Sequence, residues 1–349
     1  MSNPPFFKNR RRTFWHLEGL KRRPTDYDVT SSNLLYSQGR FEVNVPIADW
    51  YSKYQLGSRV HSGDLEAFRD PRETTYSKYV EIQKAKEVFV DGLFSAMEAK
   101  NYDRKLTPSW LQVLEQVMAP MRYPIHGLQM VAAYLGQMAP SGRVVITALF
   151  QVGDEVRRIQ RLSYRIAQLR RIRPEFAKNS QHTWENAAIW QPLRQVLERL
   201  LVTYDWAEAF IALNLVVKPA FDELFMTQFG ALAASQGDEA LEKIFLSLNE
   251  DSSWQLAWSR ALVELLLEND AGNSAVIKEF IERWSEPTLR AVWAFAPVFD
   301  ELSVLEPRPS SRDALSKVEE SCQRHWSIAG HSVSGAGQNP IHETRGMTQ

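Results

Sequence analysis

Long helical periodicity from about residue 76 to about residue 303 is the strongest constraint on the fold of this chain. Over about 143–171, one stripe recurs at alternating spacings of three and four residues, as on one side of an α-helix. The stripe consists of Leu149, Val152, Val156, Ile159, Ser163 and Ile166. Arg157, Arg161 and Arg165 lie on a different face. We interpret the arginine-rich end of this helix, from Arg157 to Arg173, as a ridge facing solvent or another subunit. The pattern predicts a mostly α-helical protein.

Further helices are predicted along the same part of the chain. They cover about 76–99, 108–138, 238–249, 252–268, 274–284 and 287–303. Asp251, Ser252 and Ser253 are the expected N-cap residues of one of them. Another long helix starts near residue 191, and Pro219 is expected to kink or end it. We therefore predict that residues 71–305 form a helical bundle.

Residues 1–70 show no sustained helical periodicity, although they are rich in proline and aromatic residues. An irregular segment this apolar is costly to leave in water, so we expect it to lie along another surface. We predict an extended N-terminal arm that contacts a partner subunit. The expected contact residues are Phe14, Trp15, Tyr27, Trp50, Tyr51 and Tyr54. The alternative is that the arm belongs to the core of this chain.

Residues 306–349 form a third region. A short amphipathic stretch around 312–327 predicts one helix, and residues 328–349 have no periodicity. We expect the end of the chain to be a flexible tail.

Composition excludes several classes of protein. The 41 Lys and Arg residues balance 42 Asp and Glu residues, so no net field draws the chain to nucleic acid or to a membrane. A single cysteine, Cys322, excludes a disulfide framework and a thiolate-rich metal site. We found neither a signal-peptide pattern nor an apolar stretch long enough to span a bilayer. We expect a cytoplasmic protein with no nucleic-acid or membrane partner.

The sequence also lacks common catalytic motifs. We found no Walker loop, no G-x-G-x-x-G after a strand, no G-x-S-x-G and no H-E-x-x-H. A helical bundle can hold two iron ions through Glu and Glu-x-x-His ligands, yet none of the seven histidines has Glu three residues before it. We interpret His126 as a buried core histidine. We predict no catalytic residue, no cofactor-binding residue and no metal ligand in this chain.

Several motifs resemble a known family. The segment Tyr204–Phe210 continues as IALNLVVKP to Pro219, and this stretch is similar to the hydroxylase β subunit of bacterial multicomponent monooxygenases. The toluene, alkene and isoprene branch is the most similar. Further similar segments are Thr13–Val29, Asp49–Tyr51 and Trp258–Val263, so the resemblance covers about residues 13–300.

The resemblance implies a ferritin-like helical bundle. In the family, the catalytic α subunit holds a di-iron centre through Glu and Glu-x-x-His ligands. The corresponding positions here are near Gly127, Glu155 to Arg158, Ala207 and Ser252 to Gln255, and they keep only one Glu. This chain should therefore bind no iron, and we expect apolar side chains to fill its centre.

The resemblance also implies a role and partners. The chain would be a non-catalytic, structural β subunit in a dimer of αβγ trimers, with the di-iron centre in the partner α subunit. The complex would oxidise alkenes, isoprene or toluene-like aromatics with O2 and NADH-derived electrons. A ferredoxin and a small coupling protein would dock on it, and no residue here selects the hydrocarbon. Two alternatives remain: a stand-alone helical interaction protein, and an oxidase that binds iron despite the missing ligands.

Overall fold

The computed structural model describes residues 17, 20, 22–32, 46–300 and 310–329, which contain helices and turns and no strand. The α-helices are α1 (Asp26–Ser32), α2 (Pro46–Tyr51), α3 (Tyr76–Ala99), α4 (Pro108–Val113), α5 (Arg122–Met138), α6 (Gly142–Ile172), α7 (Ser180–Asn186), α8 (Gln191–Leu201), α9 (Trp206–Ile211), α10 (Lys218–Phe221), α11 (Phe229–Ser235), α12 (Glu239–Asn269), α13 (Asn273–Trp293), α14 (Ala296–Asp300) and α15 (Ser311–Trp326). None of the described helices is both long and apolar enough to cross a bilayer.

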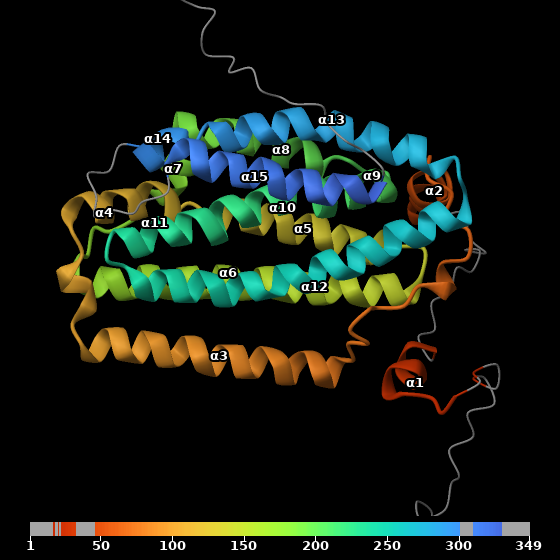
Figure 1. The fold of residues 1–349 in the computed structure, drawn as a ribbon, viewed down its shortest axis with the longest axis horizontal. Helices are drawn as coiled ribbons and strands as arrows, with labels where there is room; N and C mark the ends of the chain where they lie inside the picture. The colour runs from red at the N-terminus through yellow and green to blue at the C-terminus, as the bar shows by residue number, and fades with distance from the viewer. Residues whose placement is uncertain (1–16, 18–19, 21, 33–45, 301–309, 330–349) are drawn as a thin grey trace, which may run out of the picture.

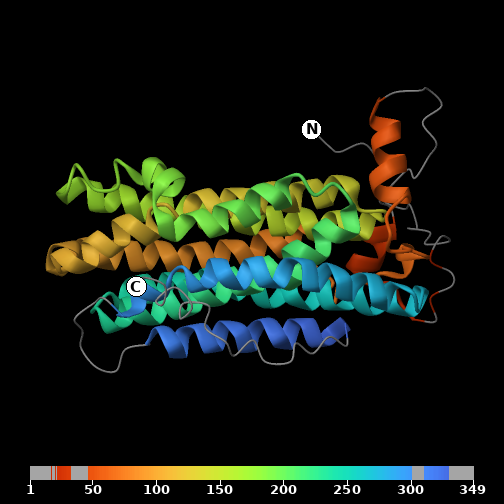
Figure 2. The same cartoon turned by 90° about the horizontal axis from the view of Figure 1, so that it is seen from above.

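The long helices form a bundle around one apolar core (Figure 1). In this view α3 lies below α6 and α12, while α13 and α15 lie above them. Seen from above, α5 and α6 run along one side and α15 along the opposite side (Figure 2). Fully buried tryptophans occur throughout this core: Trp110, Trp190, Trp206, Trp258, Trp284 and Trp326.

One continuous helix spans residues 206–235, through Pro219. It contains α9, α10 and α11, joined by two π-helical segments, Ala212–Val217 and Asp222–Gln228. The expectation that Pro219 ends the helix is therefore wrong, and the predicted helix from residue 191 breaks earlier, between Leu201 and Trp206. Pro219 follows a π-helical segment, where the turn is wider than in an α-helix and the backbone hydrogen bonds are already rearranged. We call residues 206–235 the central helix.

Helix α6 exposes apolar residues and buries charged ones. Leu149 and Val156, from the predicted stripe, are 50% and 39% exposed, whereas Arg158 and Arg165 are fully buried. The interpretation of the arginines as a solvent- or subunit-facing ridge is therefore wrong for the buried ones, whereas Arg171 and Arg173 at the end of the helix are exposed. Arg157, for example, is buried and pairs with Glu87 on α3 at 2.6 Å.

The described part of the arm is largely helical and joins the bundle before residue 70. Val60, Leu65 and Phe68 are buried in the main core, so the chain enters the bundle earlier than the expected boundary. At the other end, α15 matches the predicted helix around 312–327. The predicted tail lies mostly outside the described residues, at 330–349.

Candidate functional site

Four charged side chains lie at the centre of the bundle, and we call them the ion quartet. Glu155 and Arg158 come from α6, and Lys218 and Asp222 come from the central helix. Lys218 Nζ lies 2.6 Å from Glu155 Oε1 and 2.9 Å from Asp222 Oδ2. Arg158 Nη1 lies 2.6 Å from Asp222 Oδ1 and 3.4 Å from Glu155 Oε2. All four are buried, and their formal charges sum to zero.

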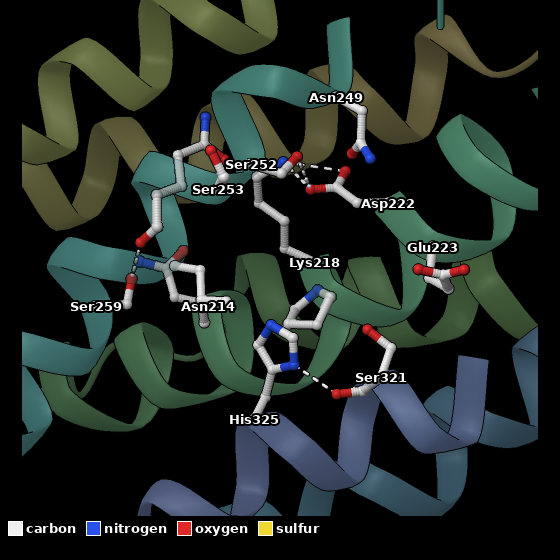
Figure 3. Close-up of a pocket in the computed structure, with 13 residues that line it drawn as sticks. Asn214, Lys218, Asp222, Glu223, Asn249, Ser252, Ser253, Ser259, Ser321 and His325 are labelled. Carbon is white, nitrogen blue, oxygen red and sulfur yellow. Dashed lines mark hydrogen bonds and ion pairs between the residues drawn. The ribbon is translucent and has the colours of Figure 1, made fainter. Parts of the chain in front are cut away.

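Helical spacing and one serine hold the quartet together. Positions three or four apart share a helix face, so Glu155 and Arg158 face the same neighbour, as do Lys218 and Asp222. Ser252 on α12 accepts a hydrogen bond from Arg158 Nη2 at 2.7 Å. It donates one to Asp222 Oδ2 at 2.6 Å (Figure 3). The quartet thus connects α6, the central helix and α12.

Pairing keeps Asp222 and Arg158 charged despite their burial. Burial raises the pKa of Asp222, but Arg158 and Lys218 lower it more, to about 2. Burial lowers the pKa of Arg158, but the charges of Asp222 and Glu155 raise it by more, so the pKa of Arg158 lies above its usual value. Asp222 and Arg158 therefore remain a charged pair at the centre.

A second polar group lies beside the quartet, between α3, α6 and α12. Gln83 Nε2 donates to Asp154 Oδ1 at 2.8 Å and to Asp251 Oδ1 at 2.9 Å. Lys86 and Arg157 pair with Asp251 at 2.6 Å and 3.1 Å. Among the described residues no cation pairs with Asp154, and burial and then the charge of Asp251 raise its pKa well above the usual value.

A partly open cavity of about 220 Å³ borders the quartet. The central helix, α12 and α15 line it, with His325 and Ser321 on the α15 side (Figure 3). His325 Nδ1 contacts the carbonyl oxygen of Ser321, an acceptor, so the proton of the neutral ring lies on Nδ1. Sequence analysis did not identify this cavity.

The residues do not form a metal site. Within the described ranges, no three His, Cys, Asp or Glu side chains come together to hold a metal ion. The oxygens of Glu155 and Asp222 already contact the cations Lys218 and Arg158. A di-iron pair therefore does not fit these residues.

The resemblance located part of this centre correctly. Glu155, Arg158 and Ser252 meet at the centre. Gly127 instead faces Leu197 on α8, and Ala207 lies in the first turn of α9. The expectation of an apolar centre is wrong, because the centre is ionic. The missed signal was a lysine and an aspartate four residues apart in an otherwise apolar helical stretch, Lys218 and Asp222.

Four of the predicted arm contacts can be placed. Trp50, Tyr51 and Tyr54 are half-buried, whereas Tyr27 is only 6% exposed and packs inside its own chain. Its hydroxyl accepts a hydrogen bond from the Asp70 amide at 3.0 Å. Tyr27 therefore offers little surface to a partner. The other two, Phe14 and Trp15, lie outside the described residues.

The three half-buried aromatics dock the arm on its own bundle. Trp50 and Tyr54 pack around Tyr204, with ring centroids 4.8 Å and 5.4 Å from it. Trp50 Nε1 also donates to the Tyr134 hydroxyl at 3.2 Å. The rest of their surface remains accessible.

His126 is exposed on α5, so its interpretation as a buried core histidine is wrong. The residues around it in sequence are mostly buried, but its own side chain points away from the core.

Comparison with known proteins gives consistent matches. The family model described as Methane/Phenol/Alkene Hydroxylase matches residues 48–270. The β subunit of the hydroxylase component of toluene-4-monooxygenase from Ectopseudomonas mendocina is 32% identical over 292 residues, covering 81% of this chain and 89% of that one. The small subunit of the hydroxylase component of propane 2-monooxygenase from Rhodococcus jostii is 25% identical, covering 85% and 83%.

Solved structures confirm the expected ferritin-like helical fold. A chain of toluene 4-monooxygenase, solved with toluene in its resting active site, superimposes with a TM-score of 0.78 at 32% identity, covering 82% of this chain and 97% of that one. A chain of xenon-pressurised phenol hydroxylase from Pseudomonas sp. OX1 gives 0.80 at 18% identity, covering 90% and 93%. The second match bears on the fold alone.

Proposed function

Because the chain belongs to the methane, phenol and alkene hydroxylase family, we propose that it is a non-catalytic β subunit of the hydroxylase component of a multicomponent monooxygenase. Two relatives named as β or small subunits of such components support the subunit role. The ion quartet supports the non-catalytic role.

The quartet is the observation that carries this proposal. A di-iron centre in a helical bundle uses carboxylates and two Glu-x-x-His motifs on facing helices. Here the histidine position of one motif is Arg158, and Lys218 lies between the two carboxylates that face each other, Glu155 and Asp222. Bringing a metal into this centre would leave an arginine and a lysine buried without their partners, which is strongly unfavourable.

The chemistry then belongs to a partner. We assign the di-iron centre to a larger α subunit that oxidises alkenes, isoprene or toluene-like aromatics with O2 and NADH-derived electrons. This chain and a small γ subunit complete a cytoplasmic dimer of αβγ trimers, on which a ferredoxin and a coupling protein dock. The present chain fixes geometry and supplies contacts, including Trp50, Tyr51 and Tyr54 of the arm.

The decisive experiment is purification of this chain, tagged, from its native host, with mass spectrometry of the associated chains and an iron count on the same sample. We expect a larger chain with two Glu-x-x-His motifs, and iron in proportion to that chain. Recovery of this chain alone and without iron would favour the stand-alone interaction protein. Iron bound to this chain after separation from all others would contradict the non-catalytic role.

A further inference from the structure

The cavity beside the ion quartet extends along the helices that line it. On the central helix its lining includes Asn214, Lys218 and Asp222, which recur every four residues and so share one side. On α12 the lining runs from Asn249 to Ser259, about 15 Å along the helix axis. A cavity of about 150 Å³ can hold benzene, so one of about 220 Å³ has room for a small elongated molecule.

Two deeply buried amide side chains of this lining have unused hydrogen-bonding atoms. Asn214 and Gln255 are 5% and 3% exposed. Asn214 Oδ1 accepts a hydrogen bond from Gln151 Nε2 at 2.8 Å, and Gln255 Nε2 donates one to Asp154 Oδ2 at 2.8 Å. Within the described part of the chain, Asn214 Nδ2, Gln255 Oε1 and Asn249 Oδ1 have no hydrogen-bond partner. Because buried polar atoms without a partner are costly, these three indicate that a polar molecule occupies the cavity.

Hydrogen-bond acceptors predominate among the free atoms of the lining. Gln255 and Asn249 each have a free oxygen. Glu223 is half-buried, and its Oε1 accepts a hydrogen bond from Gln228 Nε2 at 2.6 Å, but no lysine or arginine of the described ranges pairs with it. Burial lowers the pKa of His325, so its ring is neutral at about pH 7. With the ring proton on Nδ1, His325 Nε2 is an acceptor. A ligand of this cavity must therefore supply mainly donors.

The charge of the lining also favours a cation. Its charged residues are Lys218, Asp222 and Glu223, one cation and two carboxylates. Lys218 and Asp222 pair with each other at 2.9 Å, so the charge of Glu223 has no counterpart in the lining. An ammonium group suits this environment, because it carries three donors, no acceptor and a positive charge. Pro219 and Leu256 add apolar surface against which an aliphatic chain can pack.

The two ends of the cavity differ in chemistry. Figure 3 shows Glu223 and Asn249 at one end and Asn214 at the other. The α6 residues that bond to Asn214 and Gln255 are one helical turn apart, so these two amide side chains are neighbours. The free donor of Asn214 and the free acceptor of Gln255 match the two hydrogen-bonding groups of an amide.

We propose that the cavity binds a small molecule with an ammonium group at one end, a short aliphatic chain and a neutral amide at the other. The ammonium group pairs with Glu223 and donates to Asn249 Oδ1, and the chain packs on Pro219 and Leu256. The side chain of a lysine, with the peptide group beside it, offers the same chemistry from another protein. The inference does not depend on the proposed function, because every lining residue belongs to this chain.

The test is a titration of the full chain with 5-aminopentanamide, followed by ligand-observed NMR because so small a molecule binds weakly. Pentanamide, which lacks the ammonium group, is the matched probe, and Nα-acetyl-lysine amide represents a lysine of another protein. Glu223→Gln removes the charge but keeps the oxygen that accepts from Gln228. The matched control is Glu320→Gln, an exposed position on α15 outside the cavity. Leu256→Phe narrows the cavity, and circular dichroism establishes that each variant is folded.

We expect one saturable site for 5-aminopentanamide. Binding should weaken about 10-fold in Glu223→Gln and about 10-fold for pentanamide, because each change removes a charged hydrogen bond. Glu320→Gln should bind like the wild type, and Leu256→Phe should bind more weakly. If Glu223→Gln is folded and binds like the wild type, or if pentanamide binds equally well, the inference is wrong. Absence of saturable binding of both ammonium probes means that the cavity holds only water and also overturns it. Binding of the lysine derivative alone would support the ammonium site and identify its source as another protein.

Discussion

Lys218→Met is the most direct test of the ion quartet. Methionine keeps the length and flexibility of the side chain but removes its charge. Lys218 Nζ contacts one oxygen of Glu155 at 2.6 Å and both oxygens of Asp222, at 2.9 Å and 3.2 Å. Its loss leaves two buried carboxylates facing only Arg158, an uncompensated negative charge.

We expect Lys218→Met to lower the free energy of unfolding by ~3–5 kcal/mol, the usual cost of removing one partner from a buried ion pair. The double variant Lys218→Met/Glu155→Leu removes one charge of each sign and leaves Arg158 paired with Asp222 at 2.6 Å. Its loss should be smaller than that of the single variant, because charge-balanced apolar replacement of buried pairs is often close to neutral. The control is Arg260→Met, which breaks an exposed pair with Glu264 and should cost under about 1 kcal/mol.

The single variant should also depend on pH. Without Lys218, burial raises the pKa of one quartet carboxyl, so the folded variant holds a proton that the unfolded chain releases. A folded-state pKa above the unfolded value makes stability fall as pH rises, so the deficit should be larger at pH 8 than at pH 5. The stability deficit is measured by urea unfolding, followed by circular dichroism, at pH 5 and at pH 8. A single variant that loses no more than the control, or a double variant that loses more than the single, would refute the reasoning.

Three further predictions concern other parts of the structure. The pKa of Asp154 is raised above its usual 3.8, so the folded chain retains a proton there and its stability falls as pH rises above that value. Asp154→Asn should flatten this pH dependence of stability in urea titrations at pH 5–8. Equal slopes of stability against pH in the variant and the wild type would contradict the prediction. A Cβ at Gly153 would collide with the Tyr79 hydroxyl, so Gly153→Ala should cost about 1–3 kcal/mol, and Tyr79→Phe in the same chain should recover part of that loss in thermal unfolding. Trp50→Ala should weaken binding to the larger subunit while the helical circular dichroism signal stays unchanged. The control Trp293→Ala, at a position 41% exposed on α13, should leave binding intact. Equal effects of the two substitutions on binding would argue against the arm contact.

Helix positions were largely predictable because periodicity reports them directly. The predicted helix over 76–99 matches α3, and the helix over about 143–171 matches α6. Two predicted helices around residue 251 are one helix, α12. The apparent capping residues misled the prediction, because Asp251 pairs with Lys86 and Ser252 bonds to Asp222 instead of capping a helix end.

The site was less predictable than the helices. Apolar and polar periodicity locates the two sides of a helix, but it does not say which side faces the core. On α6 two residues of the predicted apolar stripe, Leu149 and Val156, are exposed, whereas Arg158 and Arg165 are buried, so periodicity alone misplaced the buried side. The partners of Glu155 lie more than 60 residues away, on the central helix, and only the fold brings them to it.

The ion quartet also bears on how the chain matures. A centre neutralised by imported ions is complete only after those ions have been delivered, so its formation follows the supply of metal in the cell. Arg158 and Lys218 are attached to the backbone and arrive with the helices that carry them. From the proposed non-catalytic role we expect the chain to fold without iron, so growth under iron limitation should leave its accumulation unaffected.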